Sequence, residues 1–345
     1  MKTHANIPIF IPHAGCPHTC SFCDQRAISG RAGPPTPDQV RETLAAAHDT
    51  LKAPAEIAFF GGSFTAVAPD YRRSLLGVAA EFLDGETFTG IRVSTRPDAI
   101  DLGILDELSA AGVTAIELGA QSMDDEVLRH SGRGHTAEDT REAARLIRVH
   151  GFSLGLQVMT GLPGDTDQKA LATAVELAVL SPDTMRIYPA LVLRGSQLEE
   201  LYQRGDYRPQ TLEQAIDLCA QLLRLFTREG VRVIRLGLHN EANTQDSIVA
   251  GPCHPAFREL VEGQILLEDV FSAIKADQIP TGPLTISVAP GSQSKMAGQN
   301  RRNIAALEKL GYRTSIYTDP NLGYLQLTVG GAPPRVPEGS TNIPV

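Results

Sequence analysis

Three cysteines near the amino terminus are the side chains best suited to metal chemistry. Cys16, Cys20 and Cys23 have the spacing C-x3-C-x2-C and directly follow a short apolar run, residues 7–11, that we expect to form a strand. Soft thiolates at this spacing can bind three irons of a cubane cluster and leave the fourth iron open to a small molecule. The triplet therefore predicts a reactive [4Fe-4S] cluster.

A structural zinc ion is the alternative occupant of the same thiolates. Zinc usually takes four protein ligands, and His13 or His18 can supply the fourth. However, no second Cys-x2-Cys pair or matching histidine pair lies further along the chain. The other two cysteines stand apart: Cys219 is interpreted as a packed thiol on the apolar face of a helix. Cys253, next to His254, is interpreted as part of a structural turn before a helix, with a loop that faces a site as the alternative.

The elements that must position the cysteine loop alternate between strands and helices. The expected strands are 7–11, 56–60, 91–94, 115–118, 153–159 and 185–189, and the helices include 37–51, 70–83, 100–111, 136–150 and 211–229. About six such strand–helix repeats predict a parallel α/β sheet or barrel, which binds its ligands at the carboxyl ends of the strands.

The division of the chain follows from this pattern. We expect a core barrel over residues 1–240, a helical connector over 241–280, a small α+β basic domain over 281–332 and a flexible tail over 333–345. The small domain reads as strand 284–288, helix 299–310 and strands 313–317 and 324–329.

The composition is that of a folded protein. The 345 residues are 42% hydrophobic and 21% charged, which excludes a disordered chain, a collagen-like fibre and a disulfide mini-protein. A net charge of -9 argues against a broad nucleic-acid-binding surface. No apolar run is long enough to cross a bilayer, and residues 7–11 are too short for a signal peptide. We expect a cytoplasmic protein with no membrane partner.

One segment is basic despite the acidic whole. Residues 290–316 contain five basic side chains and one acid, Glu308. Arg301 and Arg302 fall on the expected helix of this segment, where guanidinium and backbone N–H groups can meet RNA phosphates. The alternative is an ordinary solvated helix face.

The strand ends carry motifs that, in this order, resemble a known family. FFGGSF, STRPD, ELGAQS and GLPGD, together with the cysteine triplet, resemble the radical S-adenosylmethionine (SAM) superfamily over residues 7–238. STRPD, GVTAIELGAQS, RGHTAEDT and RIYPALVLRGS are similar to the radical SAM domain of the Elongator catalytic subunit, which modifies wobble uridine in tRNA. The resemblance implies a partial (β/α)6 radical SAM barrel with a small C-terminal α+β domain.

The resemblance also implies the cofactors and the reaction. In this superfamily the open iron of a [4Fe-4S] cluster chelates SAM, and an electron cleaves SAM to give a 5'-deoxyadenosyl radical that takes hydrogen from the substrate. A flavodoxin or ferredoxin would supply the electron, and tRNA is the implied partner. The residues implied to contact SAM are Gly61, Gly62 and Ser63 at its amino acid end, Gln121 and Gln157 at the ribose, Arg133 at the carboxylate, and the turn 161–164 at the adenine.

The sequence leaves the roles of several residues open. Arg96 and Glu117 are expected at strand ends, where they contact SAM or substrate, or pair with each other. Ser94 stands where relatives often carry Glu. Tyr188 and Arg194 are candidate substrate contacts, with a packing role as the alternative. Two other functions remain: a radical SAM enzyme for a tetrapyrrole or another small molecule, since GRGHT and GLPG also resemble oxygen-independent coproporphyrinogen oxidase, and a zinc-stabilised RNA-binding module. The Elongator subunit continues into an acetyltransferase-like domain, which we do not expect in this chain.

Overall fold

The chain folds into two compact units. The computed structural model describes residues 5–12, 14–16, 20–23, 33–238 and 247–330. The first unit comprises residues 1–215 and 225–253, and the second comprises residues 216–224 and 254–345. Within the described ranges, no helix has the length and apolar character that a membrane span needs.

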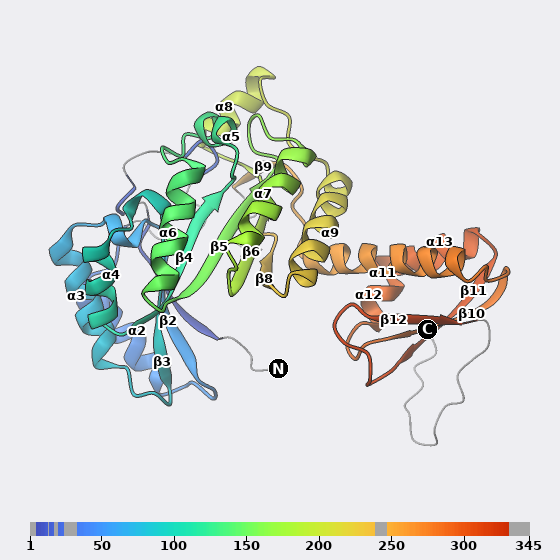
Figure 1. Ribbon diagram of the computed structural model, residues 1–345, viewed down its shortest axis with the longest axis horizontal. Coiled ribbons are helices and arrows are strands. Elements are labelled where there is room, and N and C mark those ends of the chain that lie inside the picture. The colour runs from blue at the N-terminus through green and yellow to red at the C-terminus, as the bar shows by residue number, and fades with distance from the viewer. Residues whose placement is uncertain (1–4, 13, 17–19, 24–32, 239–246, 331–345) are drawn as a thin grey trace. The chain divides into compact units, whose positions relative to one another are not determined.

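A seven-stranded parallel sheet forms the first unit and curls into a half-barrel (Figure 1). Its strands follow one another in chain order: β1 (Asn6–Phe10), β2 (Ala55–Phe60), β3 (Phe88–Thr95), β4 (Val113–Gln121), β5 (Ser153–Thr160), β6 (Thr184–Pro189) and β8 (Arg232–Leu236). Parallel neighbours need crossover connections, and the intervening helices supply them. The predicted α/β partial barrel is confirmed.

Helices cover one face of this sheet (Figure 1). They are α2 (Pro37–His48), α3 (Pro69–Glu81), α4 (Leu102–Ala110), α6 (Ala137–Val149) and α7 (Asp167–Val179), and α9 (Leu212–Arg228) precedes the last strand. Along β3, buried Ile91 and Val93 alternate with Arg92 and Ser94. Because successive side chains of a strand point to opposite faces, the apolar residues face the helices and the polar ones line the concave face. The concave face of the sheet is therefore polar, and the face covered by helices is apolar.

Short elements surround the carboxyl ends of the strands. They are η1 (Phe64–Ala66), η2 (Pro97–Ala99), α5 (Asp125–His130), β7 (Val192–Leu193), α8 (Gln197–Arg204) and β9 (Ile248–Ala250), and β7 pairs with β9 in antiparallel fashion. Asp124 caps α5 and Ser196 caps α8 by accepting hydrogen bonds from backbone N–H groups of the first turn. None of these elements was among those expected from the sequence.

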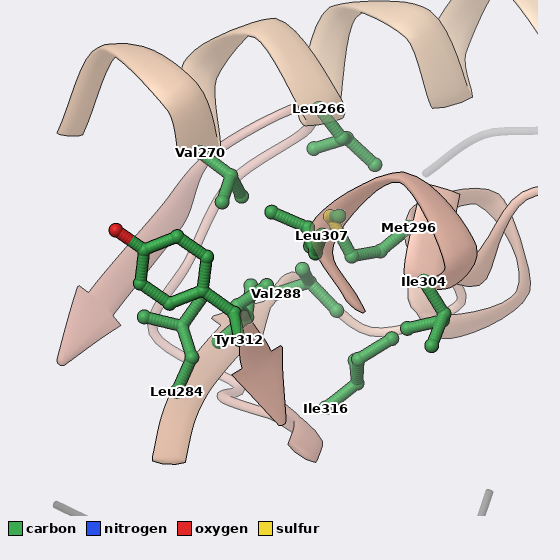
Figure 2. Packing of buried hydrophobic residues seen from close by; sticks show 10 residues of the cluster. Leu266, Val270, Leu284, Val288, Met296, Ile304, Leu307, Tyr312 and Ile316 are labelled. Carbon is green, nitrogen blue, oxygen red and sulfur yellow. The ribbon is translucent and has the colours of Figure 1, made fainter. Parts of the chain in front are cut away.

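The second unit packs helices on one face of a three-stranded sheet. It contains α11 (Phe257–Ala276), β10 (Gly282–Val288), α12 (Gln293–Ala297), η3 (Gln299–Arg301), α13 (Arg302–Lys309), β11 (Tyr312–Thr318) and β12 (Leu327–Gly330). β10 lies in the centre, parallel to β11 and antiparallel to β12. Figure 2 shows Leu266 and Val270 of α11 directed at Leu307 and Val288 in its apolar core. The segment expected as a connector therefore contributes α11 to this core.

One expected helix starts later than predicted. The helix placed at 299–310 begins at Arg302, because Asn300 and Arg301 take left-handed φ angles of 51° and 58°. Left-handed backbone cannot continue a right-handed helix. The polar segment 241–246 and the tail 333–345 lie outside the described residues.

Candidate active site

The start of the cysteine loop lies against the turn that follows β2. The Ser63 amide donates a hydrogen bond to the Ala14 carbonyl oxygen at 2.9 Å. A Cβ on Gly62 would lie 2.6 Å from the Ile11 carbonyl oxygen and closer still to that of Ala14. Gly15, at a φ of +72°, would clash in the same way with the backbone of Val67. Glycine is therefore required where the two turns approach each other.

The end of the cysteine loop is anchored by α5 and α8. The Ser21 amide donates to the Ser131 carbonyl oxygen at 3.0 Å, and the Ser21 carbonyl accepts from the Leu198 amide at 2.7 Å. Phe22 packs against two buried apolar clusters, one of which includes Leu162. Sequence reasoning missed these anchors, although Phe22 stands next to Cys23.

The three thiols differ in exposure. Cys20 is buried, whereas Cys16 and Cys23 are partly exposed, and all three are free of disulfides. Burial, reinforced by the neighbouring Cys20, raises the pKa of the Cys16 thiol. Among the described residues, no three potential ligand side chains converge on a point that could hold a metal ion. Metal binding to these thiols would release their protons.

Arg133 reaches the buried thiol from the far side of the loop. Its Nη1 donates to Cys20 Sγ at 3.2 Å and its Nη2 donates to the Gly119 carbonyl oxygen at 2.6 Å. The side chain is 7% exposed, and its Nε is buried without a hydrogen-bond partner. One strong donor of this arginine is therefore available to a ligand.

Arg96 holds the neighbouring position at the end of β3. It forms a bidentate pair with Asp98, at 2.7 and 2.8 Å, and its Nη2 also donates to the Arg133 carbonyl oxygen at 2.7 Å. Its Nη1 is buried without a partner. The alternative in which Arg96 and Glu117 pair with each other is not what the structure shows, because Arg96 pairs with Asp98 and Glu117 pairs with Arg186.

The hydroxyl of Ser63 is used inside the protein. Ser63 Oγ lies 3.0 Å from Thr95 Oγ1 and accepts a hydrogen bond from the Arg96 amide at 3.3 Å. Only 1% of Ser63 is exposed. Ser63 therefore joins the turn after β2 to the end of β3. By contrast, the hydroxyl of Ser94, on the concave face, is buried and has no hydrogen-bond partner.

Two more unpartnered polar atoms lie at the end of β4. Gln121 has a left-handed φ of 65° at a register shift between β4 and β5, and its Oε1 is buried without a partner. His135 Nε2 lies 3.2 Å from the Ala120 carbonyl oxygen, and its Nδ1 has no partner. Burial and the nearby Arg133 lower the pKa of His135 to about 4. The imidazole is therefore neutral at pH 7, with Nε2 as donor and Nδ1 as acceptor.

Glu117 lies deeper, on the concave face. Its carboxylate accepts from Arg186 Nε at 2.8 Å and Nη2 at 2.9 Å, from Gln157 Nε2 at 3.3 Å and from Arg92 Nη1 at 3.5 Å. Burial lowers the pKa of Arg186, but the Glu117 carboxylate outweighs burial and raises that pKa above its usual value. Gly155 leaves the space for this carboxylate, because a Cβ there would lie 2.7 Å from Glu117 Cγ. Glu117 thus orients Gln157.

The turn after β5 is closed by hydrogen bonds. The Gly161 amide donates to Asp165 Oδ2 at 2.9 Å, and its carbonyl accepts from the Tyr207 hydroxyl at 2.6 Å. Gly164, at a φ of +78°, lies against the His130 ring. Burial raises the pKa of Asp165 to about 6. The turn is a fixed backbone surface at the mouth of the half-barrel.

The residues fit the cofactors that the sequence implies. Buried polar atoms normally have partners, yet several described residues near the carboxyl ends of β3 and β4 have polar atoms with none, among them Arg96 Nη1, Gln121 Oε1, Arg133 Nε and His135 Nδ1. Arg133 itself contacts the buried Cys20 thiol, its carbonyl oxygen accepts from Arg96, and its charge acts on His135. Two donors and two acceptors beside soft thiolates suit an iron–sulfur cluster together with a small zwitterionic ligand.

A parallel half-barrel with a cysteine triplet after its first strand defines the class of protein, and comparison with known families agrees. The Radical SAM superfamily matches residues 10–177, and the Radical_SAM C-terminal domain matches residues 182–266. The chain belongs to the radical SAM superfamily of enzymes.

Individual proteins within this superfamily are also similar to the chain. The tRNA uridine(34) acetyltransferase of Methanocaldococcus jannaschii is 36% identical over 36% of this chain and 24% of its own length. Elongator complex protein 3 of Mus musculus is 30% identical over 58% of this chain and 40% of its own length. The match thus spans less than half of either relative. The solved structure of Methanocaldococcus infernus Elp3 shares the fold, with a TM-score of 0.61 and 21% identity over 81% of this chain and 64% of that one.

Proposed function

We propose that this chain binds a [4Fe-4S] cluster through Cys16, Cys20 and Cys23 and cleaves SAM reductively in order to modify tRNA. The observation that carries the proposal is the set of unpartnered buried atoms of Arg96, Gln121, Arg133 and His135, together with the contact of Arg133 with Cys20. When bound, the cluster supplies one electron that splits SAM into methionine and a 5'-deoxyadenosyl radical, which takes a hydrogen atom from the substrate.

The protein's own part is to bind and orient SAM. Arg133 Nε and Arg96 Nη1 are donors and suit a carboxylate, whereas Gln121 Oε1 and the neutral His135 Nδ1 are acceptors and suit hydroxyl or ammonium hydrogens. Gln157, held by Glu117, is assigned to the ribose. Preorganised donors and acceptors hold the reacting bond in place without rearranging during the reaction.

Two observations support tRNA as the substrate. First, one of the relatives above is a tRNA uridine(34) acetyltransferase, and another is Elongator complex protein 3. Second, Arg301, Arg302, Lys309 and Arg313 are exposed, and within the described part of the chain the structure gives none of them an ion-pair partner. Unpaired cations bind phosphates by releasing counterions. Lys295, counted with them from the sequence, is instead bound to the buried Glu262 at 2.6 Å.

The cluster and SAM cleavage are tested together by anaerobic reconstitution. We expect about four irons per chain and, with dithionite and SAM, release of 5'-deoxyadenosine. Cys20→Ala should lose both, whereas Cys253→Ser, a change at an exposed thiol outside the triplet, should keep both. Failure of the unmodified protein to release the nucleoside, or one zinc in place of iron, would overturn the proposal.

The substrate is tested separately. Mass spectrometry of tRNA nucleosides from cells with and without this protein should show one nucleoside that depends on it. In gel shifts with bulk tRNA, Arg301→Glu/Arg302→Glu should weaken binding at least tenfold, whereas Arg141→Glu/Arg145→Glu, which reverses two arginines paired with acids on α6, should weaken it much less. Equal effects of the two double variants on tRNA affinity would show that Arg301 and Arg302 of the second unit do not contribute specifically to tRNA binding. An unchanged nucleoside profile would favour a small-molecule substrate.

A further inference from the structure

The contact between Arg133 and Cys20 assigns this arginine a role that does not involve SAM. We infer that Arg133 donates a charge-assisted hydrogen bond to the Cys20 thiolate in the loaded protein and thereby raises the reduction potential of the cluster. The inference rests on the proposed function, because it requires Cys20 to bind a cluster. It starts from the 3.2 Å separation between Arg133 Nη1 and Cys20 Sγ.

Hydrogen bonds of both the side chain and the backbone hold Arg133 in this place. Arg133 Nη2 donates to the Gly119 carbonyl oxygen at 2.6 Å, and the Arg133 amide donates to the Leu128 carbonyl oxygen at 3.0 Å. The Arg133 carbonyl oxygen in turn accepts from Arg96, which Asp98 fixes. Because the Arg133 backbone is fixed at the end of α5 and its guanidinium is bound to β4, the hydrogen bond to sulfur is part of the folded structure.

Glycine at position 119 provides the necessary space. A Cβ there would lie 2.8 Å from Gln121 Nε2 and 3.2 Å from Arg133 Nη2. A larger residue would require the Gln121 amide to shift and would crowd the Arg133 guanidinium by a few tenths of an ångström. Glycine at this position of β4 therefore leaves room for both side chains.

Burial strengthens the electrostatic interaction between Arg133 and Cys20. Cys20 is 8% exposed and Arg133 is 7% exposed, so water screens their interaction weakly. A positive donor on a ligand sulfur stabilises the reduced, more negative form of an iron–sulfur cluster. Because Nη1 and Nη2 are used within the protein and Nε is not, the same arginine can contact sulfur and a SAM carboxylate at once. The two roles are separable, since only the first exists without SAM.

The test is an EPR-monitored redox titration of the reconstituted protein without SAM. Arg133→Met removes the charge and the donor, Arg133→Gln keeps a neutral donor and Arg133→Lys keeps the charge. We expect the midpoint potential to become more negative in all three, most of all in Arg133→Met. Arg129→Met removes a neighbouring arginine whose side chain is 72% exposed on α5, and it should leave the potential unchanged.

The outcomes distinguish this inference from the proposed function. If the unmodified protein holds no cluster, the proposed function fails first. If the Arg133 variants hold a full cluster at the potential of the unmodified protein, and lose only the change in EPR signal that SAM produces, Arg133 serves SAM alone and the inference is wrong. If Arg133→Met does not hold a cluster, the potential of Arg133→Gln decides in the same way.

Discussion

The carboxylate of Glu117 is held by both arms of the Arg186 guanidinium, at 2.8 and 2.9 Å, in the interior of the half-barrel. Glu117 is 1% exposed, and Arg92, 3% exposed, approaches the same carboxylate from β3. A charge in such a place is tolerated only with partners. The pair therefore fixes the relative positions of β3, β4 and β6 below the site.

Glu117→Gln should destabilise the protein strongly. The change leaves the buried Arg186 without its opposite charge, and breaking a buried pair from one side costs about 3–5 kcal/mol of unfolding free energy. Urea unfolding followed by circular dichroism measures the loss. Glu142→Gln is the matched control, because Glu142 pairs with Arg145 on the surface of α6. A loss for Glu117→Gln no larger than that of the control would contradict the structural role assigned to this pair.

Gly62→Ala should impair cluster assembly without unfolding the protein. The added methyl group would overlap the carbonyl oxygens of Ile11 and Ala14, so it must push the cysteine loop off the turn after β2. We expect less than half the iron of the unmodified protein after reconstitution, measured by iron assay, with an unchanged circular dichroism spectrum. Gly77→Ala on α3 adds the same methyl group where nothing lies within 4 Å, and it should keep the iron. Full iron in Gly62→Ala would show that the loop tolerates displacement.

Local sequence patterns were enough to predict the half-barrel. Alternating strands and helices imposed parallel pairing, and Cys16, Cys20 and Cys23 fell after the first strand as expected. The partners of the site residues were not predictable in the same way. Arg133 and Cys20 are 113 residues apart, and Arg186 and Glu117 are 69 apart. No short-range pattern specifies which of several arginines a given thiol or carboxylate will meet, because strand register and loop packing decide it.

The second unit shows the same limit. Five basic residues in 290–316 suggested a uniform basic surface, yet Lys295 is bound to Glu262 of α11, an acid outside the counted segment. Similarly, the helix expected from residue 299 begins at Arg302, because Asn300 and Arg301 take left-handed φ angles that the sequence did not mark. Pairing across elements changed the charge that this surface presents.

Glu262 should make the second unit sensitive to acid. Burial works to raise the pKa of Glu262, but hydrogen bonds from Lys295, Tyr324 and Arg258 outweigh it and hold the pKa below its ordinary value of 4.5. A lowered folded pKa means that the stabilisation is complete above about pH 4.5 and is lost as the pH falls through the folded value. Hydrogen exchange should show the amides of β10 and β11 losing protection below this pH, and Glu262→Gln should lose that protection already at pH 7. Equal protection in the variant at pH 7 would contradict the assignment.

His135 is the titratable group of the site whose protonation is most strongly opposed by the fold. The imidazole is 4% exposed and stands near Arg133, and both burial and that positive charge keep it neutral. Its pKa is about 4, compared with 6.5 for an ordinary histidine. Between these two values the unfolded chain binds a proton that the folded chain does not.

The free energy of unfolding should therefore contain a term from His135 that is constant above about pH 6.5 and decreases as the pH falls toward 4, since stability rises with pH wherever the unfolded state holds more protons. In His135→Gln this term is absent. The difference in unfolding free energy between the unmodified protein and His135→Gln should consequently be larger at pH 7.5 than at pH 5, measured by urea titration at both pH values. A difference that does not change with pH would mean that His135 titrates normally in the folded protein and is not the neutral acceptor assigned to SAM.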